Sequence, residues 1–592
     1  MDKALTWDLE IMYKGYDDPK YSSDKQKLEE LIKTSMSIKI LKEYPKETIR
    51  KYLELSVALE EVIMELFAYS SLRVSTNVND YQAMAEMGKI RMQLQALIPS
   101  SIAFEKFLKP LNLDEISKDD DLIKEHLFIL KKMQDSAKHS LSDKEELIAS
   151  KLSLVGSNAW SNLQSSLTAN LSIEVKGFEK PMPLSAVRNL AYDPSSEVRR
   201  NAYDAEIKAY KQIEASVAMA LNNIKREVNI LVPMRKYKDA LDVTLKNSNM
   251  SKKTLNALIS AMNDAMPKFR KYFQLKAKAL GHKNGLPFYD LFAPMGHLVK
   301  NYSYEEASNL VIEVYDSFSK KLGDMARRAF SERWIDVLPH EGKRGGAFCA
   351  GLSNHGQSRV LTNFTGSLGD VQTLAHELGH AYHGQVTLDN SPLNREYPMP
   401  LAETASIFCQ TLMTKKMLND LDDPLEKLTV VEQSLQEDSQ CIVDILSRYL
   451  FETDVLSKPV EVSISSEEMC KMMLDAQSKT YGDGLDKEYM HPYMWLCKSH
   501  YYSAGLNFYN WPYAFGTLYG KGLYKQYLKD KDGFVKKYDE MLRRTGYMSV
   551  EEVAASMGID VTKKAFWKES IDFILEDVEL FKKLLKETKL IK

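Results

Sequence analysis

Two histidines and a glutamate stand close together in the segment from Asp370 to His383, DVQTLAHELGHAYH. His376 and His380 are four residues apart, so on a helix their imidazole rings project from one face. Glu377 directly follows the first of them. This spacing is typical of the two-histidine half of a zinc site, with the glutamate placed to take a proton from water. The chemistry that these residues predict is metal-assisted hydrolysis.

A hydrolytic zinc site needs a third protein ligand and an open fourth position. Glu403, in the segment PLAETASIFCQTLM, is the best candidate, and 22 residues separate it from His380. It interrupts the edge of an apolar helical stripe, where an unpaired carboxylate is costly to bury. The alternative is an acid favoured only by the helix dipole, and Glu396 and Asp389 in the preceding loop fit less well. We expect His376, His380 and Glu403 to hold one Zn²⁺ per chain.

Two helices must position these side chains. Apolar residues recur every three or four positions from Val371 to Ala381, which predicts an amphipathic helix. Asp370 stands where an N-cap would, and is expected to cap this helix rather than to orient a metal-bound histidine. Gly384 is a natural stop. The second helix is expected to begin at Pro398 and Pro400, after a loop long enough to turn the chain back.

Two β-like runs, AFCAGL and SRVLTNF, precede the histidine helix. A turn that contains Asn354, His355 and Gly356 joins them, which predicts a hairpin. An extended peptide could add as a strand to the free edge of this hairpin, beside the metal. The alternative is an ordinary small sheet without a role in binding.

The segment HELGHAYH followed by PLAETASIF resembles the M3 (thimet oligopeptidase-like) zinc peptidases, in particular the oligoendopeptidase F branch. The resemblance implies a mainly α-helical, two-lobed zincin-type fold with a deep substrate channel and a small β-sheet beside the histidine helix. It also implies that Gly346, Ala347 and Phe348 bind substrate, because a Gly-Ala-aromatic strand lines the cleft in that family.

A tyrosine-rich segment, HPYMWLCKSHYYSAGLNFYNWPYAFG, lies far from the first motif in sequence. The family places a histidine followed by tyrosines here to stabilise an oxyanion. His500 matches that histidine, and Tyr509 and Tyr513 best match the tyrosines, although Trp511 departs from the pattern. We expect His500 and Tyr509 to be catalytic, and Tyr502 and Tyr513 to contact substrate. The alternative is an aromatic packing cluster.

Helical patterns account for most of the remaining chain. A helical region over 1–187, with an oligoendopeptidase F-type N-terminal domain within about 110–187, is expected to precede a catalytic domain over 188–592. A short strand is expected over 171–175. The expected helices cover residues 52–74, 81–98, 201–230, 251–281, 304–332, 423–457 and 465–479.

Composition narrows the class of protein. The 592 residues carry a net charge of −3, so nothing points to nucleic acid or to an anionic membrane as a partner. Five scattered cysteines, no signal-peptide pattern and no long apolar run predict a soluble cytoplasmic protein. His282 and His297 are expected to be ordinary loop residues.

These observations predict a zinc-dependent metalloendopeptidase that cuts internal bonds of short peptides, with Glu377 as the general base. One alternative is a zinc carboxypeptidase, which needs a cation such as Lys343, Arg344 or Arg359 for the terminal carboxylate. The other is a non-catalytic helical scaffold with a relic metal site, against which the intact Glu377 argues.

Overall fold

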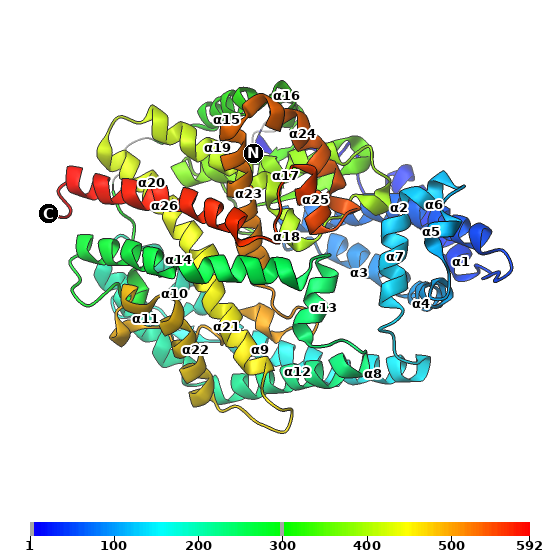
Figure 1. Ribbon diagram of the computed structural model, residues 1–592, viewed down its shortest axis with the longest axis horizontal. Helices are drawn as coiled ribbons and strands as arrows, with labels where there is room; N and C mark the ends of the chain where they lie inside the picture. Colours follow the sequence, from blue (N-terminus) through cyan, green and yellow to red (C-terminus); the bar gives the residue numbers. More distant parts are fainter. Residues whose placement is uncertain (1–4, 297–300) are drawn as a thin grey trace. The chain divides into compact units, whose positions relative to one another are not determined.

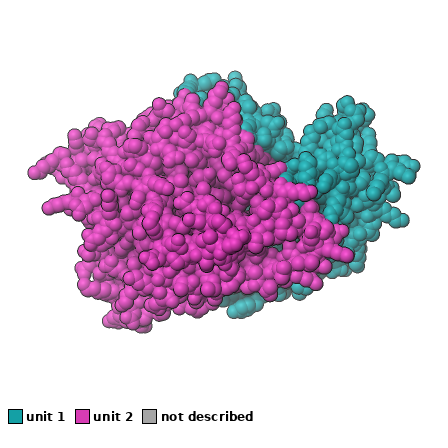
Figure 2. Space-filling view, turned by 60° about the horizontal axis from the view of Figure 1, so that its bottom comes forward, with its two compact units in different colours: residues 1–139, 300–416, 526–558 teal, residues 140–299, 417–525, 559–592 magenta. Residues whose placement is uncertain are grey.

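The computed structural model describes residues 5–296 and 301–592, and His297 lies outside them. The chain is mainly helical, as the sequence predicts (Figure 1). It forms two compact units, each assembled from three stretches of sequence (Figure 2). Unit 1 comprises residues 1–139, 300–416 and 526–558, and unit 2 comprises residues 140–299, 417–525 and 559–592.

Unit 1 begins with a helical region followed by the elements that carry the histidine motif. Asp80 caps α3 through its carboxylate, and Pro45 lies in the first turn of α2, where proline is tolerated. The helices of this unit are α1 (Pro19–Met36), α2 (Pro45–Thr76), α3 (Tyr81–Gln95), α4 (Ile98–Leu108), α5 (Leu113–Ile116), α6 (Asp121–Glu125), α7 (Leu127–Ser136), α15 (Tyr304–Phe318), α16 (Lys320–Ser331), α17 (Leu368–Val386), α18 (Met399–Ala402), α19 (Thr404–Asp420, its last turn in unit 2), α24 (Lys531–Arg543) and α25 (Val550–Ser556).

A three-stranded sheet in unit 1 confirms the predicted hairpin and extends it. Strands β4 (Phe348–Leu352) and β5 (Gln357–Leu361) are antiparallel, and β3 (Ile335–Asp336) pairs parallel with β5. The strand order β3-β5-β4 leaves β4 at an edge. Gly356 adopts a left-handed conformation with φ of 59° in the connecting turn, which favours glycine there.

The hydrophobic core of unit 1 joins this sheet to the N-terminal helices. Leu352 of β4 and Leu361 of β5 belong to the same buried cluster as Leu59 and Leu66 of α2. Burying one such leucine contributes about 1.5–3 kcal/mol. The N-terminal helices therefore support the strand that lies beside the histidine motif.

Unit 2 consists of helices around its own core, with one small sheet. Strands β1 (Ser172–Ile173) and β2 (Met182–Pro183) pair antiparallel, so the strand predicted near 171–175 is confirmed but shorter. The helices are α8 (Asp143–Val155), α9 (Ser157–Ala169), α10 (Leu184–Asn189), α11 (Ser196–Tyr210), α12 (Glu214–Met234), α13 (Ala240–Asn247), α14 (Lys252–Ala279), α20 (Pro424–Ser439), α21 (Ile445–Leu456), α22 (Ser466–Thr480), α23 (Trp511–Lys529, its last turn in unit 1) and α26 (Lys564–Glu587).

Some helix boundaries differ from the prediction. The helix predicted over 81–98 ends at Gln95, and a new helix, α4, begins at Ile98 with Pro99 in its first turn, where proline needs no backbone N–H partner. The helix predicted over 201–230 is two helices, α11 and α12, and the one predicted over 304–332 breaks at Ser319, which caps α16. Within the described residues, no helix combines the length and apolarity that crossing a membrane needs.

Candidate metal centre

Helix α17 carries the histidine motif, and its ends differ from the prediction. Ser367 is the N-cap, and Asp370 is the third helical residue that completes a capping box with it. Asp370 also accepts hydrogen bonds from Thr365, so its carboxylate is used at the helix start. Gly384 does not end the helix, which continues to Val386 because a glycine within a helix costs only about 1 kcal/mol.

Close packing brings α17 and α19 together. The residue between Leu378 and His380 is Gly379, and a Cβ atom on it would lie 2.7 Å from the Cα of Ser406 and 2.8 Å from the carbonyl oxygen of Ala405. Only a glycine lets the two backbones approach this closely. This approach carries the start of α19 to the face of α17 that bears the histidines.

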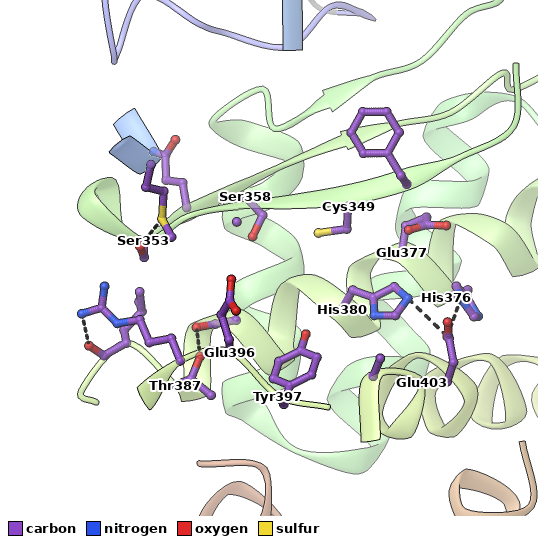
Figure 3. Close-up of a pocket in the computed structure, with 18 of the residues that line it drawn as sticks. Cys349, Ser353, Ser358, His376, Glu377, His380, Thr387, Glu396, Tyr397 and Glu403 are labelled. Carbon is purple, nitrogen blue, oxygen red and sulfur yellow. Dashed lines mark hydrogen bonds and ion pairs between the residues drawn. The ribbon is translucent and has the colours of Figure 1, made fainter. Parts of the chain in front are cut away.

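Glu403 lies at the junction between α18 and α19, with its carboxylate between the two histidines. Its Oε2 is 3.2 Å from Nε2 of His376 and 3.4 Å from Nε2 of His380. One donor atom from each residue lies within 4.8 Å of the others, in the only such group among the residues that the structure describes. Figure 3 shows the two imidazole rings turned toward Glu403. Ser406 donates a 2.6 Å hydrogen bond to the same Oε2.

Electrostatics keeps Glu403 ionised. Burial opposes the carboxylate, but hydrogen bonds from His376 and His380 outweigh it and hold the pKa of Glu403 below its ordinary value. Burial also disfavours charge on His376, yet Glu403 raises the pKa of that histidine to about 9. A metal ion that displaces the protons of the two imidazoles would meet two nitrogens and one carboxylate, which fit the three-ligand set of a hydrolytic Zn²⁺.

A glutamine that the sequence did not single out orients the first histidine. Nδ1 of His376 lies 2.9 Å from Oε1 of Gln410, one of the residues on α19. Because an amide oxygen only accepts, this contact places a proton on Nδ1 and directs Nε2 toward Glu403, so Nε2 is the nitrogen that can coordinate a metal once it loses its own proton. Helical spacing could have suggested Gln410, which follows Glu403 by seven residues and lies on the same face.

Glu377 is nearly buried, with 7% of its surface exposed. Burial raises its pKa, and the neighbouring imidazoles of His376 and His380 only partly offset that effect. A carboxylate with a raised pKa is suited to accept a proton and to give it back near neutral pH. Figure 3 shows Glu377 beside Cys349 of β4, above the group of His376, His380 and Glu403.

A cavity of about 780 Å³ adjoins this group within unit 1. Ala347 and Phe348, two of the three residues expected to bind substrate, line it. Gly346 does not line the cavity, but its φ of 82° requires glycine and its carbonyl oxygen accepts a hydrogen bond from Asn363. His355, expected to be a turn residue, lies in the turn, and its Nε2 is 2.8 Å from Oε1 of Glu65.

Several residues of the cavity were not expected from the sequence. Tyr397 stacks face to face on the buried His383, with ring centres 4.0 Å apart and planes inclined by 2°. His383 Nε2 lies 2.8 Å from Thr545 Oγ1, which fixes the histidine. No periodic signal could have found the others, since they lie in strands, turns and loops: Cys349, Ser353, Ser358, Thr387, Arg395 and Glu396.

The tyrosine-rich segment belongs to unit 2, where it forms an aromatic group of its own. The ring of Tyr509 lies 6.3 Å from that of His500 and 5.7 Å from that of Tyr513. Burial, with Arg448 and other cations, lowers the pKa of His500 to about 3, so its imidazole is neutral. Tyr502 is buried and donates a hydrogen bond to the carbonyl of Trp495. Roles of these residues toward substrate stay predictions.

The cations considered for a carboxypeptidase do not line the cavity. Lys343 forms a 2.6 Å ion pair with Asp336, and its side chain is fully buried. Arg359 is also buried, and it donates hydrogen bonds to Asp8 and Gln357. Arg344 is exposed to solvent. His282, expected to be an ordinary loop residue, pairs with Asp290 at 2.6 Å in unit 2.

Comparisons with known proteins agree on one family. The sequence profile of Peptidase family M3 matches residues 189–573, and that of Oligopeptidase F matches residues 110–172. Oligopeptidase PepF of Bacillus subtilis is 24% identical over 99% of this chain and 88% of its own. A crystal structure from Chlamydophila abortus covers 99% of both chains with a TM-score of 0.85 and 21% identity. Oligoendopeptidase-F from Enterococcus faecium covers 96% of this chain and 99% of its own, with a TM-score of 0.71 and 18% identity.

Proposed function

This chain belongs to peptidase family M3 and is a peptidase, and we propose that it is a zinc-dependent endopeptidase that cuts internal bonds of short peptides. The family membership confirms the resemblance seen in HELGHAYH and PLAETASIF. The observation that carries the proposal is the convergence of His376, His380 and Glu403, from two separate segments, beside the nearly buried Glu377.

The proposed metal ligands are His376, His380 and Glu403. When bound there, Zn²⁺ would act as a Lewis acid and lower the pKa of a coordinated water toward neutrality. Glu377 takes a proton from the attacking water and then passes it to the nitrogen of the leaving amine. Gln410 and Ser406 hold one histidine and the glutamate in position through the hydrogen bonds described above.

The edge strand β4 supports an extended mode of binding. One side of β4 pairs with β5, so its other side can pair with a peptide backbone. Main-chain hydrogen bonds of this kind do not depend on the peptide sequence. We assign Gly346, Ala347 and Phe348 to this contact, since the last two line the cavity beside the metal ligands.

His500 and Tyr509 are the proposed donors to the oxygen that becomes negative as the carbonyl is attacked. The neutral imidazole of His500 keeps an N–H to donate, and its buried Nε2 has no hydrogen-bond partner among the described residues. Tyr513, 36% exposed, is proposed to contact the peptide. Tyr502, the other residue expected to do so, is 1% exposed and donates its hydroxyl to the carbonyl of Trp495, so we assign it no contact with the peptide. Removing one oxyanion donor typically lowers turnover by about a hundredfold to a thousandfold.

Zinc analysis and digestion of a mixed peptide library, with and without a chelator, test this function. We expect about one zinc per chain, cleavage within acetylated and amidated peptides, and loss of cleavage on chelation that added zinc restores. An obligate carboxypeptidase could not cut the blocked peptides. A protein that takes up no zinc, or that holds zinc and cuts no peptide, would refute the proposal.

A further inference from the structure

The cavity at the metal centre continues along α17 beyond the three ligands. It extends past Gly384 to Thr387 and Leu388, and residues 395–397 of the loop before α18 also line it. Thr387 follows His380 by seven residues, which corresponds to roughly 10 Å along a helix. A peptide whose scissile bond lies at the metal would thus place a neighbouring side chain in this distal part.

One carboxylate in this distal part is not engaged by the protein. Glu396 lines the cavity and is exposed. Figure 3 shows its carboxylate pointing away from its own loop into the cavity, toward Ser358 of β5. Among the described residues, no ion pair or hydrogen bond involves this carboxylate, whereas Glu403 accepts a hydrogen bond from Ser406 and contacts two histidines.

The other charged residue of the distal part is engaged. Nε of Arg395 donates a 3.0 Å hydrogen bond to the carbonyl of Asn390, and Nη2 donates one of 3.0 Å to that of Leu388. Burial lowers the pKa of Arg395, and the charge of Glu61 on α2 partly offsets this effect. The guanidinium is therefore held by carbonyl groups of its own loop, and the carboxylate of Glu61 interacts with it electrostatically.

Two groups outside the cavity lie within electrostatic reach of Glu396. Glu60 of α2 is one helical turn from the cavity-lining Met64, and burial together with the charge of Glu396 raises its pKa. Burial lowers the pKa of Lys132 on α7, and the negative charge of Glu396 partly offsets this effect. No ion pair joins Lys132 to Glu396 among the residues described. A cation that entered the cavity would meet an acid with no ion-pair partner.

From this distribution of charge we propose that the distal part of the cavity selects a lysine or arginine side chain of the peptide, next to the bond that is cut, through an ion pair with Glu396. The inference rests on the proposed peptidase function and names a substrate preference for it. Such a side chain matches the cavity in two ways. Its aliphatic stem can lie along Leu388, and its charged head reaches the carboxylate.

Tyr397 completes this proposed subsite. Its ring is fixed by the stack on His383, and burial keeps its hydroxyl protonated by raising its pKa. Among the described residues, no hydrogen bond occupies this hydroxyl. Figure 3 shows it within the cavity, between Glu396 and His380. Beside a guanidinium or ammonium group, the phenol oxygen can accept a hydrogen bond.

A library digest with the full-length zinc-loaded protein tests the proposal first. Lysine and arginine should be enriched at one position adjacent to the cut bonds. A peptide pair that differs only by arginine or its neutral isostere citrulline at that position then measures the preference. We expect about a threefold to tenfold higher kcat/KM for arginine, decreasing as salt rises because the pair is partly exposed.

Charge-changing variants assign the preference to one carboxylate. Glu396→Gln should reduce the ratio of arginine to citrulline to about one, Glu396→Asp should retain most of it, and Glu396→Lys should favour peptides with glutamate at this position. Glu54→Gln, which removes an exposed acid of α2 outside the cavity, should leave the ratio unchanged.

The outcomes separate this inference from the function on which it rests. A protein that cuts neutral peptides in a chelator-sensitive way but shows no basic preference refutes the subsite alone. The same holds if acidic residues are enriched, or if Glu396→Gln keeps the arginine preference. A protein that cuts no peptide at all refutes the proposed function instead.

Discussion

Replacing Gly379 with alanine tests whether the closeness of α17 and α19 holds the proposed metal ligands together. The added Cβ would lie 2.7 Å from the Cα of Ser406, 2.8 Å from the carbonyl oxygen of Ala405 and 3.0 Å from the amide nitrogen of Ser406. All three atoms belong to the backbone of α19, so no side-chain rotation can relieve the contacts. The helices must move apart by roughly 0.7 Å to restore ordinary contact.

Stability and metal binding should respond differently to this change. Overpacking of this kind costs about 1–3 kcal/mol, while alanine gains about 1 kcal/mol over glycine within a helix. The free energy of unfolding should therefore fall by only about 0–2 kcal/mol. Metal–ligand distances, in contrast, tolerate deviations of about 0.2 Å. Since Glu403 is three residues from Ser406, we expect zinc affinity to fall about tenfold to a hundredfold.

Two measurements on the same samples check this reasoning. Urea unfolding of the metal-free protein gives the stability, and competition with a chromophoric chelator gives the zinc affinity. Gly384→Ala is the matched control on the same helix, because its Cβ would meet only Oγ of Ser358, at 4.0 Å. The control should gain about 0.5–1 kcal/mol and bind zinc normally. Wild-type zinc affinity in Gly379→Ala would show that the close approach is not required.

Four further predictions concern single side chains. Glu377→Gln should keep zinc but lower kcat by about a hundredfold to ten-thousandfold, as the loss of a general base does; peptide turnover beside metal analysis checks this, and near-normal turnover would contradict the proton-transfer role. His500→Gln should lower kcat by about a hundredfold or more with zinc retained, and the pH profile of wild-type kcat/KM should show no ionisation of His500 between pH 5 and 8, because its pKa is about 3. Gln410→Ala should weaken zinc binding about tenfold or more while Gln410→Glu keeps it, because the acceptor to His376 is lost only in the first; equal affinities would exclude the orienting role. Burial lowers the pKa of His383 to about 3, below the ordinary value near 6.5. The neutral, buried His383 therefore contributes its full share of stability above pH 6.5, and that share is lost as pH falls toward 3. Denaturant unfolding from pH 7 to 4 should accordingly show a weaker pH dependence in His383→Gln than in the wild type.

The grouping of His376, His380 and Glu403 could be predicted because it depends mainly on helical periodicity. Four-residue spacing alone predicts that His376 and His380 share a face, and the apolar stripe predicts the helix that carries them. That Glu403 reaches them from a second segment required only a turn of sufficient length. The reason the two segments approach so closely could not be predicted, because it depends on what faces Gly379 across the interface.

Residues in loops and strands were harder to assign. The sequence offers Glu396 only as a poorer alternative to Glu403 as a metal ligand, since nothing in its sequence context shows that it borders a cavity. Tyr397 and His383 are 14 residues apart, and their stacking depends on the path of an irregular loop. The start of α17 also differs from the prediction, because Ser367 and Asp370 are both good capping residues and only the backbone decides which is the N-cap. The division at residue 187 stays a prediction.

The order in which the chain leaves the ribosome bears on how the histidine helix is completed. Unit 1 is finished by residues 526–558, which follow the histidine motif by about 150 positions. Tyr382 donates a hydrogen bond to Asp539, and His383 contacts Thr545, so the back of α17 meets its partners only near the end of synthesis. Such distant contacts slow folding, because the loop between them must close first. A nascent chain interrupted before this point would carry every proposed zinc ligand but would lack residues 526–558, which supply the contacts to the back of α17.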